Sequence, residues 1–136
     1  MGSKVIESEI RELIETYLKA WNARDFEKMA SLFSEPITYV VPNGTLHVPN
    51  RRALISKLKK QFSELEAEGF DHTEIEEVVV TQCNDTTSLV EMRNLRRLRS
   101  DSSELEKRDA LYICVLQDGV WRLSIAMACW LGWNNP

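Results

Sequence analysis

The chain has 136 residues, of which 43% are hydrophobic and 28% are charged, and its net charge is −4. These values predict a single globular domain over residues 1–136, with a core large enough to need no cross-links. The acidic balance argues against a general nucleic-acid-binding surface or a surface for anionic membranes, so we expect neither partner.

The cysteines and histidines are too scattered to predict a metal site or a disulfide framework. The three cysteines are Cys83, Cys114 and Cys129, and the two histidines are His47 and His72. An odd number of distant cysteines without CxxC spacing is typical of a protein from a reducing compartment. Because the chain also lacks a glycine-rich phosphate loop and begins with a segment too polar for a signal peptide, we expect no metal, no cofactor and a cytoplasmic location.

The first 48 residues predict two helices followed by a short hairpin. Apolar residues recur at spacings of three and four over Val5–Trp21, which predicts an amphipathic helix. The pattern then breaks, and Asp25 is placed to cap a second helix that Pro36 would end. The β-branched and aromatic run Ile37–Val41 predicts a strand, and Thr45–Val48 predicts a short return strand after a Pro-Asn-Gly turn.

The remainder of the chain predicts a third helix and then an antiparallel sheet. The third helix covers roughly Arg51–Glu68, and Gly69 suits its C-terminal end. The predicted strands, separated by polar turns, are His72–Gln82, Thr87–Arg99, Leu105–Leu116 and Val120–Trp130. The predicted fold class is therefore α+β, with three N-terminal helices packed in a curved, mainly antiparallel sheet.

The last predicted strand indicates how the chain associates. Both sides of Val120–Trp130 are apolar, which suggests that the outer face of the sheet is covered as well as the inner one. The simplest cover is a second copy of the chain, so we expect a homodimer through the outer sheet face.

Residues at both ends of the chain carry a resemblance to a known superfamily. At the front these are Tyr17, Ala20, Asn22, Asp25, Leu32, Phe33, Pro42 and Gly44, and at the back the run is Asp118-Gly119-Val120-Trp121-Arg122-Leu123. This order resembles the nuclear transport factor two-like superfamily, also called the SnoaL-like or cystatin-like α+β cone. The resemblance implies a cone-like barrel with a pocket between the helices and the concave sheet face. It implies no single activity, because isomerases, dehydratases, cyclases and transport factors share this fold.

The front of the chain is most similar to ketosteroid isomerase. In an ungapped comparison, the tyrosine that donates to the substrate oxyanion in that enzyme falls on Tyr17. The position of its catalytic base falls on Val41, and its second oxyanion donor falls near Leu111 or, with a shift of two residues, on Asp109. Since valine cannot accept a proton, steroid isomerisation by that route is excluded.

Several side chains are candidates for the implied pocket. The candidate catalytic residues are Tyr17, as a hydrogen-bond donor to a ligand carbonyl, and Asp109, as an acid or base where a polar segment becomes apolar. The alternatives are a core tyrosine and a surface aspartate paired with a neighbouring arginine. The candidate ligand-binding residues are Trp21, Tyr39, Val41, Phe62, Met92 and Asn94.

A basic run within the second long strand offers a further candidate. Its members are Arg93, Arg96, Arg97 and Arg99. Strand alternation places Arg93, Arg97 and Arg99 on one face, and Asn94 with Met92 on the other. One arginine inside the pocket could bind a carboxylate by a bidentate contact, whereas the alternative is a charged stripe paired with glutamates across the hairpin.

Two functions follow from these patterns. The first is a SnoaL-like pocket protein that binds a small apolar or carbonyl-containing molecule, either as a binding protein or as a cofactor-free isomerase, cyclase or dehydratase. The second is a non-catalytic dimerisation or protein-interaction module. The second function predicts a cavity filled by Trp21, Tyr39, Phe62 and Met92, together with an exposed apolar patch.

Overall fold

A computed structural model describes residues 3–134 of the chain. Its helices are α1 (Ser3–Ala23), α2 (Phe26–Ser31) and α3 (Arg51–Ala67). Its strands are β1 (Phe33–Val41), β2 (Gly44–Val48), β3 (Phe70–Asn84), β4 (Thr87–Arg99), β5 (Glu104–Gln117) and β6 (Val120–Cys129). None of the helices within residues 3–134 has the length and apolar character needed to cross a membrane.

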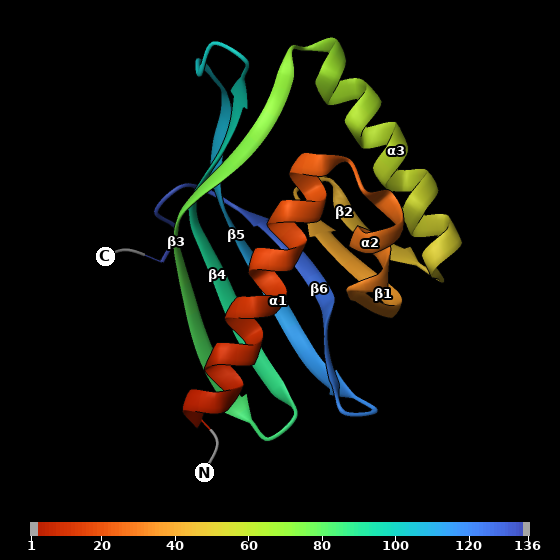
Figure 1. Ribbon diagram of the computed structural model, residues 1–136, viewed down its shortest axis with the longest axis vertical. Helices are drawn as coiled ribbons and strands as arrows, with labels where there is room; N and C mark the ends of the chain where they lie inside the picture. The colour runs from red at the N-terminus through yellow and green to blue at the C-terminus, as the bar shows by residue number, and fades with distance from the viewer. Residues whose placement is uncertain (1–2, 135–136) are drawn as a thin grey trace.

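The strands form one six-stranded sheet in the order β2-β1-β6-β5-β4-β3. Neighbouring strands are antiparallel except for β1 and β6, which are parallel. The sheet is curved and open, with β2 and β3 as its edges, and α1 crosses its concave face while α2 and α3 lie near β1 and β2 (Figure 1). The predicted α+β class, with helices packed in a curved and mainly antiparallel sheet, is confirmed.

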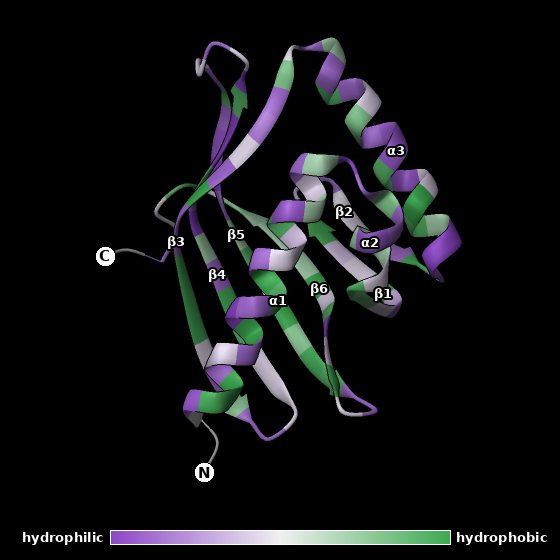
Figure 2. Ribbon diagram, in the orientation of Figure 1, coloured by the Kyte–Doolittle hydropathy of each residue, from purple (hydrophilic) through white to green (hydrophobic). Residues whose placement is uncertain are grey.

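The concave face of the sheet and the apolar sides of the helices share one core. Hydrophobic residues are concentrated along β5 and β6 behind α1 (Figure 2). The largest fully buried apolar side chains come from all three helices and from the sheet: Ile10, Met29, Phe33, Ile37, Leu54, Leu58, Phe62, Val90, Met92 and Leu123. Burial of each such side chain contributes about 1.5–3 kcal/mol, so this core holds α1 and α3 against the sheet at fixed positions.

The second helix ends earlier than the sequence pattern predicts. Asp25 does cap α2, because its Oδ1 accepts from the backbone N–H of Lys28 at 3.1 Å. The helix stops at Ser31, however, and Pro36 lies inside β1 after a cis peptide bond. The β1–β6 pairing is interrupted between Phe33 and Thr38, so the missing N–H of Pro36 breaks no ladder bond there. The prediction that Pro36 ends the helix is wrong.

A bulge in β4 reverses the side-chain alternation predicted for that strand. Met92 pairs with Ala110, but the next pair joins Leu95 to Arg108, and between them Asn94 has a positive φ of 52°. Because a β-bulge shifts all later residues by one position, Arg97 faces the concave side together with Met92. The predicted placement of Asn94 beside Met92, and of Arg97 on the opposite face, is wrong.

Candidate functional site

A partly open pocket of about 130 Å³ lies between the helices and the concave sheet face. Its walls come from α1, α3, β1, β4, β5 and β6: Tyr17, Trp21, Tyr39, Val41, Lys57, Leu58, Gln61, Leu95, Arg97, Arg108, Ala110, Tyr112, Ala126, Met127 and Ala128. A cavity of about 150 Å³ in another protein holds a benzene molecule, so this pocket has room for a group near the size of one aromatic ring.

Two buried tyrosines meet in the pocket. The Tyr17 and Tyr112 hydroxyl oxygens are 3.4 Å apart, and the two rings pack edge to face with their centroids 6.0 Å apart. Burial raises the pKa of both phenols, so both stay protonated at neutral pH. Since one hydrogen bond between them uses one proton, the pair keeps a second O–H to donate to a ligand.

Trp21 and Arg97 line the side of the pocket that is shared with a second, smaller cavity. The indole Nε1 of Trp21 donates to the Thr73 hydroxyl at 2.8 Å, and the Arg97 guanidinium carbon lies 5.6 Å from the indole centroid. Beyond them is a side chamber of about 40 Å³, which Met92 also lines. The hydrogen bond to Thr73 fixes the indole plane against which Arg97 stacks.

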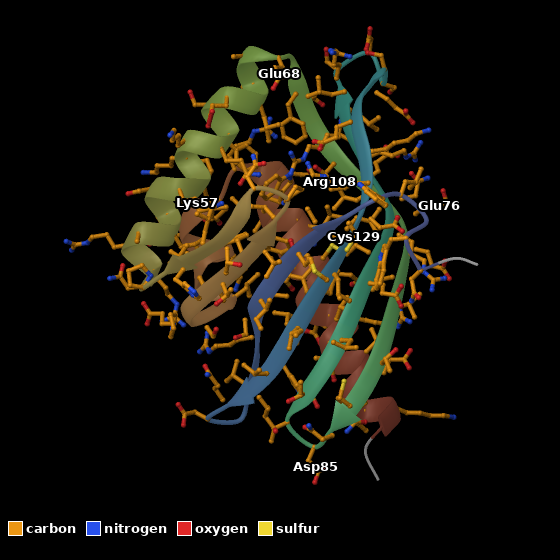
Figure 3. All side chains as sticks on the ribbon, turned by 180° about the vertical axis from the view of Figure 1, so that it is seen from behind. Lys57, Glu68, Glu76, Asp85, Arg108 and Cys129 are labelled. Atoms are coloured by element: carbon orange, nitrogen blue, oxygen red, sulfur yellow. The ribbon has the colours of Figure 1, made fainter. Side chains whose placement is uncertain are left out.

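Three basic side chains border the pocket: Lys57 from α3, Arg97 from β4 and Arg108 from β5. Figure 3 labels Lys57 and Arg108. Arg97 Nη1 donates to Glu106 Oε2 at 3.0 Å, and Arg108 pairs with the other oxygen of the same carboxylate. Lys57 instead places its Nζ 4.0 Å from the ring centroid of Tyr39. Burial lowers the pKa of all three groups, and the charge of Arg97 lowers the pKa of Lys57 and Arg108 further.

The pocket walls contain no aspartate or glutamate among residues 3–134. Val41, on which the sequence comparison placed the catalytic base of ketosteroid isomerase, is an apolar part of the pocket wall. In the same part of the chain, no group of three or more His, Cys, Asp or Glu side chains is placed to hold a metal ion. The arrangement can therefore donate hydrogen bonds and present positive charge, but it has no carboxylate base on its walls.

Of the eight residues predicted for the site, four line the pocket and a fifth lines the side chamber. Tyr17, Trp21, Tyr39 and Val41 all line the pocket, and Met92 lines the side chamber. Phe62 lies behind the pocket wall, where its ring centroid is 4.4 Å from that of Trp21.

Asp109 and Asn94 lie away from the pocket, on the outer side of the sheet. Asp109 is only 5% exposed, and its carboxylate accepts from the backbone N–H groups of Asn94 and Gly132, each at 2.9 Å. The side-chain amide of Asn94 donates to Glu76 at 2.6 Å. The expectation that Asp109 and Asn94 point into the pocket is wrong, because the bulge at Asn94 turns that residue outward and Asp109 binds the bulge.

Four polar pocket residues were not singled out from the sequence: Lys57, Gln61, Arg108 and Tyr112. Tyr112 could have been found from alternation, since it follows Ala110 by two residues and both face inward. Arg108 could have been found in the same way, since it precedes Ala110 by two residues. Lys57 and Gln61 gave no usable signal, because a polar residue on an amphipathic helix is usually solvated. Only the packing of α3 against the sheet turns the Lys57 and Gln61 side chains toward the pocket.

The open curved sheet, the helices on its concave face and the pocket between them define a protein of the cystatin-like α+β class. The chain belongs to the family described as NTF2-like protein (DUF6841), whose family model matches residues 8–129. A comparison with curated proteins found no match.

Solved structures show the same fold at low sequence identity. An NTF2-like protein with a cystatin-like fold from Novosphingobium aromaticivorans has a TM-score of 0.75 and 20% identity, over 94% of this chain and 84% of that one. A domain of unknown function with a cystatin-like fold from Nostoc punctiforme has a TM-score of 0.73 and 22% identity, over 94% and 78%. Aln2 from a Streptomyces species has a TM-score of 0.75 and 13% identity, over 96% and 94%. At these identities the similarity shows the fold alone.

Proposed function

We propose that this protein binds a small, mostly apolar molecule in the pocket and donates a hydrogen bond from the Tyr17–Tyr112 pair to an oxygen of that molecule. A carbonyl oxygen fits this role, because buried O–H donors act on it without competition from water. Polarising a carbonyl is also the first requirement of a cofactor-free isomerase, cyclase or dehydratase, so the same contact would serve a catalytic member of this class.

The observation that carries the proposal is the meeting of two buried, protonated tyrosines in the pocket. The hydroxyl separation of 3.4 Å is long for an O–H···O bond, so the two groups satisfy each other poorly. Buried hydroxyls are normally hydrogen-bonded. An oxygen atom of a ligand beside the Tyr17 and Tyr112 hydroxyls would accept the hydrogen bond that the pair leaves unmade.

The alternative function, a protein-interaction module without a ligand, predicts a pocket filled by aromatic side chains. Trp21 and Tyr39 line the pocket, yet about 130 Å³ stays open beside them. This open volume favours ligand binding over the alternative.

Acetophenone, a neutral ketone with one aromatic ring, is the probe that tests the proposal. We expect it to shift the amide resonances of pocket residues in two-dimensional NMR titrations of the whole chain. Removing one donor in Tyr17→Phe or Tyr112→Phe should weaken binding about 3- to 10-fold, since a hydrogen bond contributes about 0.5–1.5 kcal/mol.

Tyr39→Phe is the matched control, because it removes the remaining tyrosine hydroxyl of the pocket and keeps its ring. Its dissociation constant for acetophenone should stay within about twofold of the wild-type value, since the proposal gives that hydroxyl no ligand contact. The proposal is overturned if acetophenone leaves the pocket resonances unmoved at millimolar concentration.

A further inference from the structure

We propose that the natural ligand is an organic carboxylate, held by Lys57, Arg97 and Arg108 at one end and by the apolar wall at the other. This inference rests on the proposed function, because it names the chemical class of the molecule that the pocket binds. The ligand would then add a second negative charge to that of Glu106, which pairs with both arginines.

The first step is the balance of charge around the pocket. Three basic side chains line it, and Glu106, which pairs with both arginines, is the one carboxylate that touches any of them among the described residues. The site therefore carries an excess of positive charge, although the whole chain has a net charge of −4. A local reversal of the overall sign is expected where an anion binds.

The second step is the set of donors without acceptors. The side chain of Arg97 is only 13% exposed, and its buried Nε has no hydrogen-bond partner within residues 3–134. Lys57 forms no ion pair with a carboxylate in the same part of the chain, and its Nζ lies over the ring of Tyr39. Buried donors and charges are costly unless they are paired, so both groups favour an acceptor that enters the pocket.

The third step is the mutual repulsion of the basic groups. The charge of Arg97 lowers the pKa of Lys57 and of Arg108, so Arg97 disfavours the charged form of each of its two neighbours. An anion among them would reverse this effect and raise the pKa of Lys57. A carboxylate suits the guanidinium groups because its two oxygens match the planar donor fork of arginine.

The fourth step is the shape of the remaining wall. Leu58, Leu95, Ala110 and Ala126 line the pocket beside the tyrosines and leave room for about one ring. A free inorganic anion would leave this apolar wall unused. A compact aromatic or alicyclic acid would place its ring there and its carboxylate among the basic groups.

Benzoate and benzamide test the inference, because they share size and shape and differ in charge. Calorimetric titration of the whole chain at low salt should give a dissociation constant at least about tenfold lower for benzoate, and added salt should narrow the difference. In Lys57→Met and Arg108→Met, benzoate binding should weaken several-fold while benzamide binding stays within about twofold. Lys59→Met, an exposed position on the same helix as Lys57, is the matched control and should change neither.

The outcomes separate the inference from the proposed function. If benzamide binds as tightly as benzoate, the carboxylate inference is overturned and the ligand pocket stands. If neither molecule binds in the pocket, the proposed function falls and the inference falls with it. Should a variant fail to fold by circular dichroism, the wild-type comparison decides alone, and ¹³C-detected titration of Lys57 adds a second measurement, in which benzoate should raise the lysine pKa and benzamide should not.

Discussion

At the scale of single residues, burial decides which side chains around the pocket carry charge. It raises the pKa of the Tyr17 and Tyr112 phenols, and it raises the pKa of the Cys114 thiol behind them to about 12. All three groups are therefore neutral at physiological pH. The arginines have pKa values too high for burial to remove their charge, so positive charge remains beside these neutral phenols and this thiol.

Outside the pocket, His72 is placed to act as a charged residue. Its Nδ1 lies 2.9 Å from Asp71 Oδ2 and its Nε2 lies 3.2 Å from Glu74 Oε2, and these bonds raise its pKa, with the bond to Asp71 contributing most. A raised folded-state pKa stabilises the fold below the unfolded-state pKa of about 6.5, and this contribution is lost as the pH rises through the folded-state pKa. His72→Gln should therefore cost about 0.5 kcal/mol near pH 5.5 and close to nothing at pH 9.

Chemical denaturation of both proteins across this pH range measures the difference. His47→Gln is the control, because His47 contacts the Thr38 hydroxyl and loses no ion pair on substitution. A difference between wild type and His72→Gln that grows with pH would contradict the expected sign of the effect. Direct NMR titration of the His72 ring gives an independent reading of the same pKa.

At the scale of elements, the bulge in β4 and the carboxylate of Asp109 act together. Asn94 adopts a positive φ that asparagine tolerates, and its N–H turns to Asp109 instead of the β5 ladder. The second oxygen of the carboxylate accepts from Gly132 and so ties the segment after β6 to the sheet. One buried side chain thus satisfies both the bulge and the C-terminal segment, and the bulge in turn aims Arg97 at the pocket.

Removing this carboxylate should cost stability but leave the pocket intact. Asp109→Ala leaves the backbone N–H groups of Asn94 and Gly132 without their acceptor, at a residue that is only 5% exposed. We expect a loss of about 2–4 kcal/mol in the free energy of unfolding, measured by urea denaturation. Asp85→Ala, on the exposed turn between β3 and β4, should change it by less than about 0.5 kcal/mol.

Acetophenone binding separates the structural role of Asp109 from a role in the site. Folded Asp109→Ala should bind acetophenone within about twofold of wild type, because Asp109 is not among the residues that line the pocket. Loss of binding by a protein that still shows the native circular dichroism spectrum would return Asp109 to the set of site candidates.

The elements themselves could be predicted largely from periodicity, because α1, α3 and the four long strands each bury one regular face. The same periodicity places Tyr17 one helical turn before Trp21, and Tyr39 on the same strand face as Val41, and all four line one pocket. Beyond Asn94 the prediction fails, since a bulge depends on the partner strand and leaves no mark in a single strand pattern.

At the scale of the whole molecule, the outer face of the sheet remains partly apolar. Leu89 pairs with Ile113, and Ile113 pairs with Ile125, so these three residues form a row across β4, β5 and β6. Their strand neighbours, including Val90 and Cys114, are buried in the core, which places the row on the opposite face. Near the end of the chain, the side chains of Trp130 and Trp133 are 88% and 41% exposed.

We propose that a second copy of the chain covers this outer face. An apolar row on the outer face of a sheet is suited to a self-complementary two-fold interface, where each copy covers the row of the other. Light scattering at micromolar concentration should give a mass near twice the 15.7 kDa of one chain. Ile113→Glu places a charge at the centre of the row and should convert the dimer to a folded monomer, because an unpaired charge in an apolar interface is strongly unfavourable.

The control for this variant is Leu46→Glu, which adds the same charge at a 50% exposed position on the edge strand β2. It should stay dimeric, since β2 lies at one edge of the sheet and the row crosses the strands on the other side of β1. A wild-type protein that stays monomeric at micromolar concentration would refute the dimer. Because the pocket opens on the concave side and the row lies on the convex side, Ile113→Glu should also leave benzoate binding unchanged, which makes association and ligand binding separable properties of one sheet.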